Sequence, residues 1–341
     1  STTINSGATL QIGNASTTGS LGTGEVTNNG TLSFNRSNAM TVANTINGSG
    51  AVNQTGAGIT TLSGGNGYTG LTTVSVGTLV VTNDSALGGT ASGTTVSGGI
   101  LDIQANIGAE PITLSGGALK TTTGTGAISG SITLSSASTI TVDGSLTLSG
   151  IITGSHALTK AGSGTLNFTG ANNYVGSTTI NSGTLTVSGL GTLGSTANNL
   201  TMSNAAVLDL QRSLTVGNLV MASGNTITNS TGSSSLIVGG TASLAGNITT
   251  SGTQTYTGAV SLTATPITLT TTNSTIGFNS TLNSTASAAN ALTISTGSGN
   301  VTFTGVVGGE TNGALGALII NTTGTGTISA ALTAASITTN A

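Results

Sequence analysis

The stretch GSGTLNFTGANNYVGSTTINSGTLTV, Gly162 to Val187, decides the fold, because the same pattern stands at Gly56 to Val81 as GAGITTLSGGNGYTGLTTVSVGTLVV. Each copy reads as a glycine turn, a short apolar strand, an Asn-containing turn with one Tyr, a Thr-rich strand, a Gly turn and a last strand. The copies align without a gap at an offset of 106 residues, since position 162 corresponds to position 56. An internal repeat of this kind predicts a repeat architecture.

The repeat extends on both sides of this stretch. It covers about residues 41–104 and 152–211. Residues 224–341 match the repeat less closely but keep the same Thr- and Gly-rich pattern of short strands and turns. No polar linker or change of composition separates these parts. We therefore predict one continuous domain over residues 1–341.

Strands of three to five residues alternate with Gly and Asn turns along the whole chain. Such strands cannot bury a face alone, but coils that stack on their neighbours bury the inward Leu, Val and Ile while Thr and Ser face outward. We predict an all-β, single-stranded parallel β-helix, a solenoid of about 17 coils of about 20 residues. A β-sandwich is the alternative that strand spacing alone allows. The clearest expected strands are Leu10–Ile12, Thr31–Phe34, Ile112–Leu114, Ile132–Leu134, Ile140–Val142 and Leu146–Leu148.

The composition excludes several functional classes. Charged residues make up 3% of the chain, the net charge is −3 and there is no cysteine. The four basic residues lie far apart, so no basic stripe for nucleic acid forms. No apolar run approaches the roughly 18 residues of a spanning helix, and we expect no membrane insertion by this segment. Ser1–Leu10 lacks the charged start and the apolar core of a signal peptide. The first residues of a mature or excised segment would look the same. The basic residues are Arg36, Lys120, Lys160 and Arg212.

The two copies resemble the autotransporter-associated β-strand repeat, the passenger-associated repeat of bacterial autotransporters. The shared elements are the Gly-x-Gly opening, the Asn-x-Tyr-x-Gly turn, Thr-Thr-Val/Ile and Gly-Thr-Leu-x-Val. Residues beyond Gly224 look more like the Thr/Gly-rich arrays of giant bacterial surface adhesins. The resemblance implies a right-handed parallel β-helix, secreted to the bacterial surface, that serves as an adhesin stalk or extracellular fibre. It transfers no catalytic residue.

A β-helix enzyme that cleaves polysaccharides would need a pair of neighbouring carboxylates among the seven acidic residues. Asp102 and Asp209 are equivalent by the repeat and lie about five coils apart, on the order of 25 Å. Glycosidase carboxylates lie about 5 to 10 Å apart, so these two fail as a pair and are interpreted as repeated turn or outward-strand residues. A pair of Asp84 with Asp102 or Glu110 stays open. Asn83-Asp84 and Asp143-Gly144 are interpreted as turns, and Glu25 and Glu310 complete the set.

The remaining candidates indicate structure rather than chemistry. His156 is the only histidine and falls in a turn, so with no cysteine we expect no metal site, no cofactor and no catalytic residue. Tyr68 and Tyr174 occupy one repeat position and Tyr256 is related to them. They are interpreted as packing residues, with a sugar-gripping aromatic row as the alternative.

Four functions follow as hypotheses. The first is an extracellular structural rod or fibre, whose partner is itself, head to tail or as part of a longer repeat chain, because both termini read as uncapped repeat. The second is an adhesin that binds cell-surface glycans or proteins through a loop or patch at Leu101–Lys120 or Val306–Ala317. A polysaccharide-degrading β-helix enzyme and an ice-binding protein are the others, and the chain is predicted not to be an enzyme.

Overall fold

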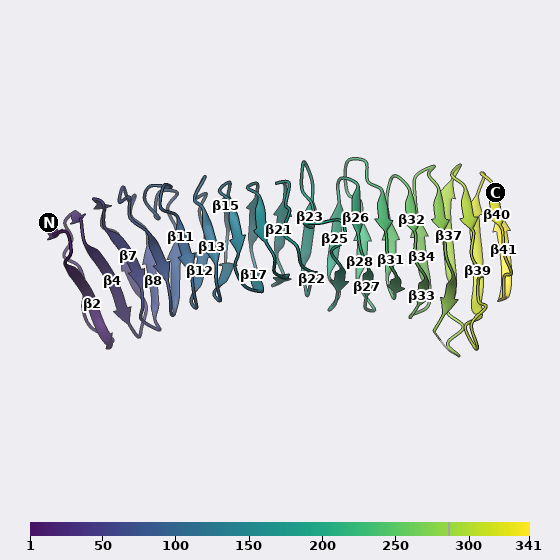
Figure 1. Ribbon diagram of the computed structural model, residues 1–341, viewed down its shortest axis with the longest axis horizontal. Helices are drawn as coiled ribbons and strands as arrows, with labels where there is room; N and C mark the ends of the chain where they lie inside the picture. Colours follow the sequence, from purple (N-terminus) through teal and green to yellow (C-terminus); the bar gives the residue numbers. More distant parts are fainter. Residues whose placement is uncertain (286) are drawn as a thin grey trace. The chain divides into compact units, whose positions relative to one another are not determined.

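The computed structural model describes residues 1–285 and 287–341. Its contacts divide the chain into unit 1, Ser1–Val175, and unit 2, Gly176–Ala341. The described residues form 41 strands and no helix, and no segment among them has the helical length and apolarity needed to cross a membrane. Each unit is a stack of parallel coils (Figure 1), and the chain makes about 17 turns of a β-solenoid. The predicted all-β solenoid is confirmed, whereas the single continuous domain stays a prediction.

Unit 1 has three faces. The strands of the first two sheets pair in parallel, each with the strand of the coil before and after it. The first sheet contains β2 (Thr9–Ser16), β4 (Thr31–Arg36), β7 (Ala51–Gln54), β9 (Thr72–Val74), β11 (Thr94–Val96), β13 (Ile112–Leu114), β16 (Ile132–Leu134) and β19 (Ile152–Gly154). The second contains β5 (Met40–Val42), β8 (Ile59–Leu62), β10 (Thr78–Val81), β12 (Ile100–Ile103), β14 (Ala118–Thr121), β17 (Ser138–Val142) and β20 (Leu158–Ala161). The third face contains β1 (Thr2–Ile4), β3 (Val26–Asn28) and β6 (Ile46–Asn47), and later β15 (Thr125–Ile128), β18 (Ser145–Leu148) and β21 (Thr165–Phe168).

Unit 2 repeats this plan with three parallel sheets. One contains β22 (Thr178–Ile180), β24 (Leu200–Met202), β27 (Leu219–Met221), β30 (Ala242–Leu244), β33 (Val260–Leu262) and β36 (Leu282–Ser284). A second contains β23 (Thr184–Val187), β25 (Val207–Leu210), β28 (Thr226–Thr228), β31 (Asn247–Thr249), β34 (Ile267–Thr270), β37 (Leu292–Gly297), β39 (Leu315–Thr322) and β41 (Ala334–Asn340). The third contains β26 (Leu214–Val216), β29 (Leu236–Val238), β32 (Gln254–Tyr256), β35 (Ile276–Phe278), β38 (Val301–Phe303) and β40 (Gly326–Ile328). Parallel pairing excludes the sandwich alternative, whose sheets are antiparallel.

The alternation of the sequence becomes an inside and an outside. Ile112 pairs with Ile132 and then with Ile152, and all three side chains are buried. The intervening threonines stack on the outer face of the same sheet, where their β-branched side chains suit strand geometry. This outer ladder runs through Thr73, Thr95, Thr113, Thr133 and Thr153. Since the paired positions of β13, β16 and β19 are 20 residues apart, the predicted coil length is confirmed for this part of unit 1.

Glycine stacks on glycine at one corner of unit 1. A Cβ on Gly150 or Gly170 would lie closer than 3.0 Å to the carbonyl oxygen of the glycine one coil earlier, and a Cβ on Gly130 would meet the carbonyl oxygen of Glu110. The same relation joins Gly70 to Gly50. Only a residue without a side chain allows the backbones of successive coils to approach this closely.

In coils that lack the third strand, asparagine side chains form hydrogen bonds to the neighbouring coils. The turn containing Tyr68 forms no strand, and its Asn66 side chain is buried. Asn66 Oδ1 accepts a hydrogen bond from Ile46 N at 2.9 Å, and Asn66 Nδ2 donates to Ala86 O at 2.7 Å. At the equivalent repeat position, Asn172 Oδ1 accepts from Ile152 N at 2.9 Å. Side-chain amides thus join coils where the backbone ladder is interrupted.

Candidate functional site

Asp102 and Asp209 join one coil to the next. Asp102 accepts hydrogen bonds from Thr122 N at 3.0 Å and from Thr122 Oγ1 at 2.6 Å. Asp209 accepts the same pair from Ser230, at 2.9 and 2.6 Å. A Gln two residues further along donates to each carboxylate. Both side chains stand on outward strand positions yet are buried, so the interpretation of the two as structural repeat residues agrees with their contacts.

The single histidine and the buried lysine also bind backbone carbonyls. His156 is half-buried in a bend, and its Nδ1 lies 3.1 Å from Leu134 O. Lys160 points into the core and donates from Nζ to Ala161 O and Gly162 O, at 2.9 and 2.8 Å. Burial lowers its pKa to about 8, against the attraction of Asp143. Gln54, its repeat equivalent, donates to Gly56 O at 2.7 Å.

The three tyrosines are buried in the core. Tyr68, Tyr174 and Tyr256 each have 0% relative exposure, so their rings are not available to a sugar at the surface, and the sugar-gripping alternative is wrong. Their burial agrees with the packing interpretation. Tyr256 also begins an internal stack, with ring centroids 5.1 Å from Phe278, which in turn lies 5.2 Å from Phe303.

Glu110 is the one acid whose environment is chemically unusual. It stands in the corner position that Gly130 and Gly150 occupy in later coils, and its side chain is 1% exposed. Thr94 Oγ1 donates to Oε1 at 2.7 Å, while Oε2 has no hydrogen-bond partner. Burial raises the pKa of Glu110 to about 7, against the lowering effect of the Thr94 hydrogen bond.

A groove crosses the outer face of the second sheet of unit 1, and we call it the outer groove. In-register residues of β8, β10, β12 and β14 form its floor, and the cavity has a volume of about 440 Å³. Val80 and Asp102 point outward but are only 9% and 4% exposed, so the sheet is concave here. The floor residues are Thr61, Val80, Asp102 and Lys120, with Ile59, Thr78 and Ile100 on one side and Thr82, Gln104 and Thr122 on the other.

A second cavity adjoins the outer groove at Thr82 and Gln104. It has a volume of about 460 Å³ and continues onto β15 and β18, where Thr125, Ser145 and Thr147 line it. Asp84 lines this second cavity and accepts a hydrogen bond from Asn106 N at 3.0 Å. Asp84 and Asp102 therefore line adjoining cavities, whereas Glu110 faces the core. Of the two carboxylates that the sequence left open as a pair with Asp84, Asp102 therefore lies on the same outer surface and Glu110 does not.

The remaining acids form no metal site. Glu25 and Glu310 are exposed, and Asp143 and Asp84 fall in a bend and a turn as expected. Within residues 1–285 and 287–341, no group of three or more His, Cys, Asp and Glu side chains is arranged to hold a metal ion. Each strand of the outer threonine ladder presents one outward Thr, so the Thr-x-Thr grid of an ice-binding surface is not formed there.

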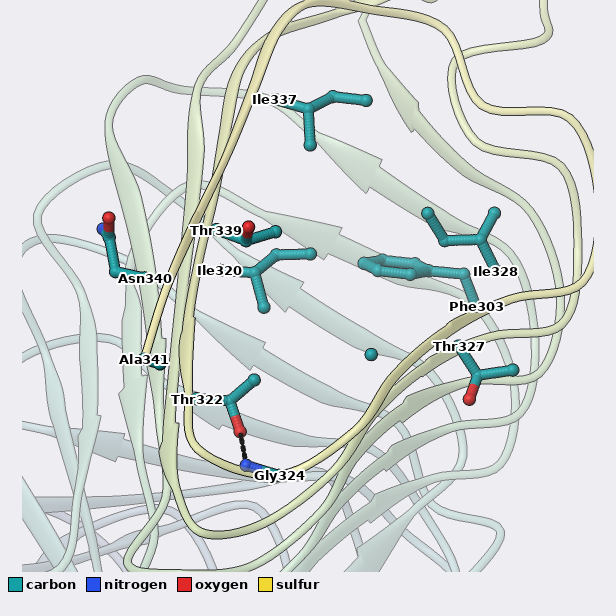
Figure 2. A pocket seen from close by; sticks show the side chains of 11 residues that line it. Phe303, Ile320, Thr322, Gly324, Thr327, Ile328, Ile337, Thr339, Asn340 and Ala341 are labelled. Carbon is teal, nitrogen blue, oxygen red and sulfur yellow. Dashed lines mark hydrogen bonds between the residues drawn. The ribbon is translucent and has the colours of Figure 1, made fainter.

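The terminal coil of unit 2 has an apolar opening of about 320 Å³. Figure 2 shows Phe303, Ile320, Ile328 and Ile337 around it. Ile328 pairs with the buried Phe303 and Ile337 pairs with the buried Leu318, so both stand at inward positions of the coil. They are nevertheless 47% and 51% exposed, because no described strand covers β40 and β41 on their outer side.

Sequence reasoning found part of this arrangement. It named Leu101–Lys120 as a patch that departs from the repeat, and this segment does line the outer groove. The interpretation of this segment as a side loop was wrong, because it contains most of β12, all of β13 and most of β14. The concavity at Val80 was missed, since a TLVV strand predicts a flat outward position. The sequence signal that could have indicated the groove is Val80, an apolar residue at an outward position of Thr78–Val81.

Two segments of the solenoid match a known family. The passenger-associated-transport-repeat family matches residues 52–81, which contain most of β7 and all of β8 to β10, and residues 158–187, which contain β20 to β23. These two segments of the chain are similar to the autotransporter passenger repeat. A related protein, the adhesin BmaC autotransporter of Brucella suis biovar 1 (strain 1330), is 42% identical over 92 residues. That alignment covers 26% of this chain and 3% of the relative's length. No solved structure matches the chain.

Proposed function

We propose that this chain is an extracellular structural segment of a bacterial surface protein, a stalk or fibre made by stacking coils. The passenger repeats and the relative named as an adhesin support a surface-exposed or secreted protein without enzymatic activity. The observation that carries the structural role is the coil-to-coil register of the repeats. Glycine corners allow successive coils to approach closely, and the buried asparagines and Asp102 or Asp209 form hydrogen bonds to a neighbouring coil.

We also propose that the partner of the apolar opening in unit 2 is another β-coil, from a longer repeat chain or from a second copy placed head to tail. The inward Ile328 and Ile337 have the positions and chemistry of core residues that a following coil covers elsewhere in the unit. The outer edge of β41 offers backbone groups for the same ladder, and an uncovered strand edge favours pairing.

The head-to-tail arrangement is tested by sedimentation of the 341-residue chain over a range of concentrations. We expect association that increases with concentration and is lost when Ile328 and Ile337 are both changed to Asp, because two charges then replace apolar core positions. The matched control is Ile237→Asp, which changes an outward isoleucine that is 39% exposed on β29. A chain that stays monomeric at every concentration contradicts head-to-tail stacking.

Resistance to trypsin is a further expectation for a stalk exposed outside the cell. Arg36 donates to Thr17 O and Gly19 O at 2.6 and 2.5 Å, and Lys160 is buried. Cleavage needs local unfolding, which stacked strands oppose. We expect the native chain to remain intact under conditions that digest the heat-unfolded chain completely, as followed by gel and mass spectrometry. Fast cleavage of the native chain after Lys160 contradicts the stacked structure at that coil.

A further inference from the structure

We propose that the outer groove of unit 1 is a binding site for an extended, neutral oligosaccharide that lies across the coils. This is a binding activity of the groove itself, so it does not depend on whether the chain assembles head to tail. The argument rests on the shape of the groove, on the groups it offers and on its difference from the equivalent place in unit 2.

The shape fits a linear polymer. Four in-register strands, β8, β10, β12 and β14, are spaced at ~4.8 Å, so the floor from Thr61 to Lys120 extends over roughly 14 Å. The cavities of about 440 and 460 Å³ are each within the size range of small-molecule sites. Because they adjoin at Thr82 and Gln104, a chain of several sugar residues can follow them from one face of the solenoid to the next.

The groups on offer suit hydroxyls. The groove is on the face of a sheet whose backbone N–H and C=O groups already pair within the ladder, so a peptide cannot add as an extra strand. What remains are side chains: the hydroxyls of Thr61 and Thr78, together with the second N–H of the Gln104 amide, whose first N–H is donated to Asp102. The aliphatic Ile59 and Ile100 flank them and offer an apolar surface to the C–H face of a sugar ring.

The charges favour a neutral ligand. Asp102 and Lys120 are paired in register on the floor, so their opposite charges offset each other. The carboxylate of Asp102 is held by Thr122, whereas Lys120 Nζ forms no hydrogen bond or ion pair within the described part of the chain. This ammonium is a donor for a ligand oxygen. Asp84, in the adjoining cavity, disfavours an acidic polymer.

The equivalent surface of unit 2 lacks counterparts of two of these charged side chains, Lys120 and Asp84. There the floor runs in register from Thr186 through Asp209 to Thr228. Thr186 and Asp209 are each 8% exposed, so outward positions are buried as they are in unit 1. Thr228 replaces Lys120, and by the offset of 106 residues Leu190 replaces Asp84. Unit 1 therefore departs from its own repeat at the groups that face the groove.

The experiment measures binding of defined soluble oligosaccharides to the 341-residue chain by microarray and then by titration calorimetry. The probes are neutral glucose and N-acetylglucosamine oligomers and acidic galacturonate oligomers of about three to six residues, long enough to span the floor of four coils. We expect a neutral oligomer to bind. Thr61→Trp, which fills the groove from an outward position, is expected to abolish binding, and Lys120→Thr to weaken it about tenfold through loss of a charged hydrogen bond.

The matched control is Thr113→Trp, the same change at an outward position of β13 outside the groove. We expect it to leave the affinity unchanged, and circular dichroism and thermal melting are used to check that each variant folds. Three outcomes overturn the site: no neutral probe binds, only acidic probes bind, or Thr61→Trp binds as well as Thr113→Trp. Because binding and sedimentation are separate measurements, failure of this site leaves the stalk function standing.

Discussion

Replacing Glu110 by Gln is expected to stabilise the solenoid at pH 8 and to remove most of a pH dependence that the wild-type chain shows. Glu110 is 1% exposed, and Oε2 has no hydrogen-bond partner. Ionisation therefore places a charge in the core with the Thr94 hydrogen bond as its one partner among the described residues, and burial outweighs that bond. Gln keeps the acceptor for Thr94 Oγ1 and carries no charge at any pH.

The sign follows from the two states of the chain. The pKa of Glu110 is about 7 in the folded state, compared with an ordinary value of 4.5. Below 4.5 both states are protonated and Glu110 costs nothing. Between 4.5 and 7 the unfolded state releases its proton first, so the free energy of unfolding falls as the pH rises. Above 7 the full penalty is present, about 3 kcal/mol from the size of the shift.

Urea unfolding between pH 5 and pH 8 measures this effect, and hydrogen exchange localises it to the coils around Glu110. We expect the wild type to lose about 2 to 3 kcal/mol over this interval and Glu110→Gln to lose much less. Glu25→Gln, a change at an exposed acid of the same unit, is the matched control and should follow the wild type. Parallel pH profiles for wild type and Glu110→Gln are the result that contradicts this account.

The architecture could be predicted from the sequence because the repeat fixes it locally. The two copies and the alternation in Ile112–Leu114 or Ile132–Leu134 predict parallel coils, since stacking is the way such short strands bury their apolar side. The strands observed at these positions have the predicted bounds. The sequence predicts a turn at Asn66 and Tyr68, and both residues do lie between strands. That both side chains are buried could not be predicted, because it depends on how this strandless part of the coil stacks on its neighbours.

The candidate sites could be predicted only in part. Glu110 was considered as a member of a carboxylate pair, because a single sequence does not show that it occupies a corner position held by glycine in neighbouring coils. That relation appears when Gly130 is stacked directly on Glu110. The outer groove depends on Val80 and Asp102 being buried while pointing outward, and such curvature arises from contacts between coils about 20 residues apart rather than from local propensity.

The second large effect is expected at the glycine corner of unit 1. Gly150→Ala should destabilise the unit by at least about 3 kcal/mol, at the upper end of overpacking costs. A Cβ on Gly150 would meet the carbonyl oxygen and carbon of Gly130 closer than 3.0 Å. Both atoms are backbone, so no side chain can rotate away, and the coils must separate locally. The separation would break the hydrogen-bond ladder on both sides of the corner.

Gly22→Ala is the control for this substitution, because a Cβ at Gly22 meets no atom within 4 Å. Both changes reduce the backbone freedom of the unfolded chain in the same way, which by itself stabilises by up to about 1 kcal/mol. The difference between the two variants in urea unfolding therefore isolates the steric effect of coil-on-coil contact. Equal stability of the two variants contradicts the idea that glycine is required where successive coils meet. A large loss confined to Gly150→Ala indicates that backbone contact at this corner sets the spacing of the coils.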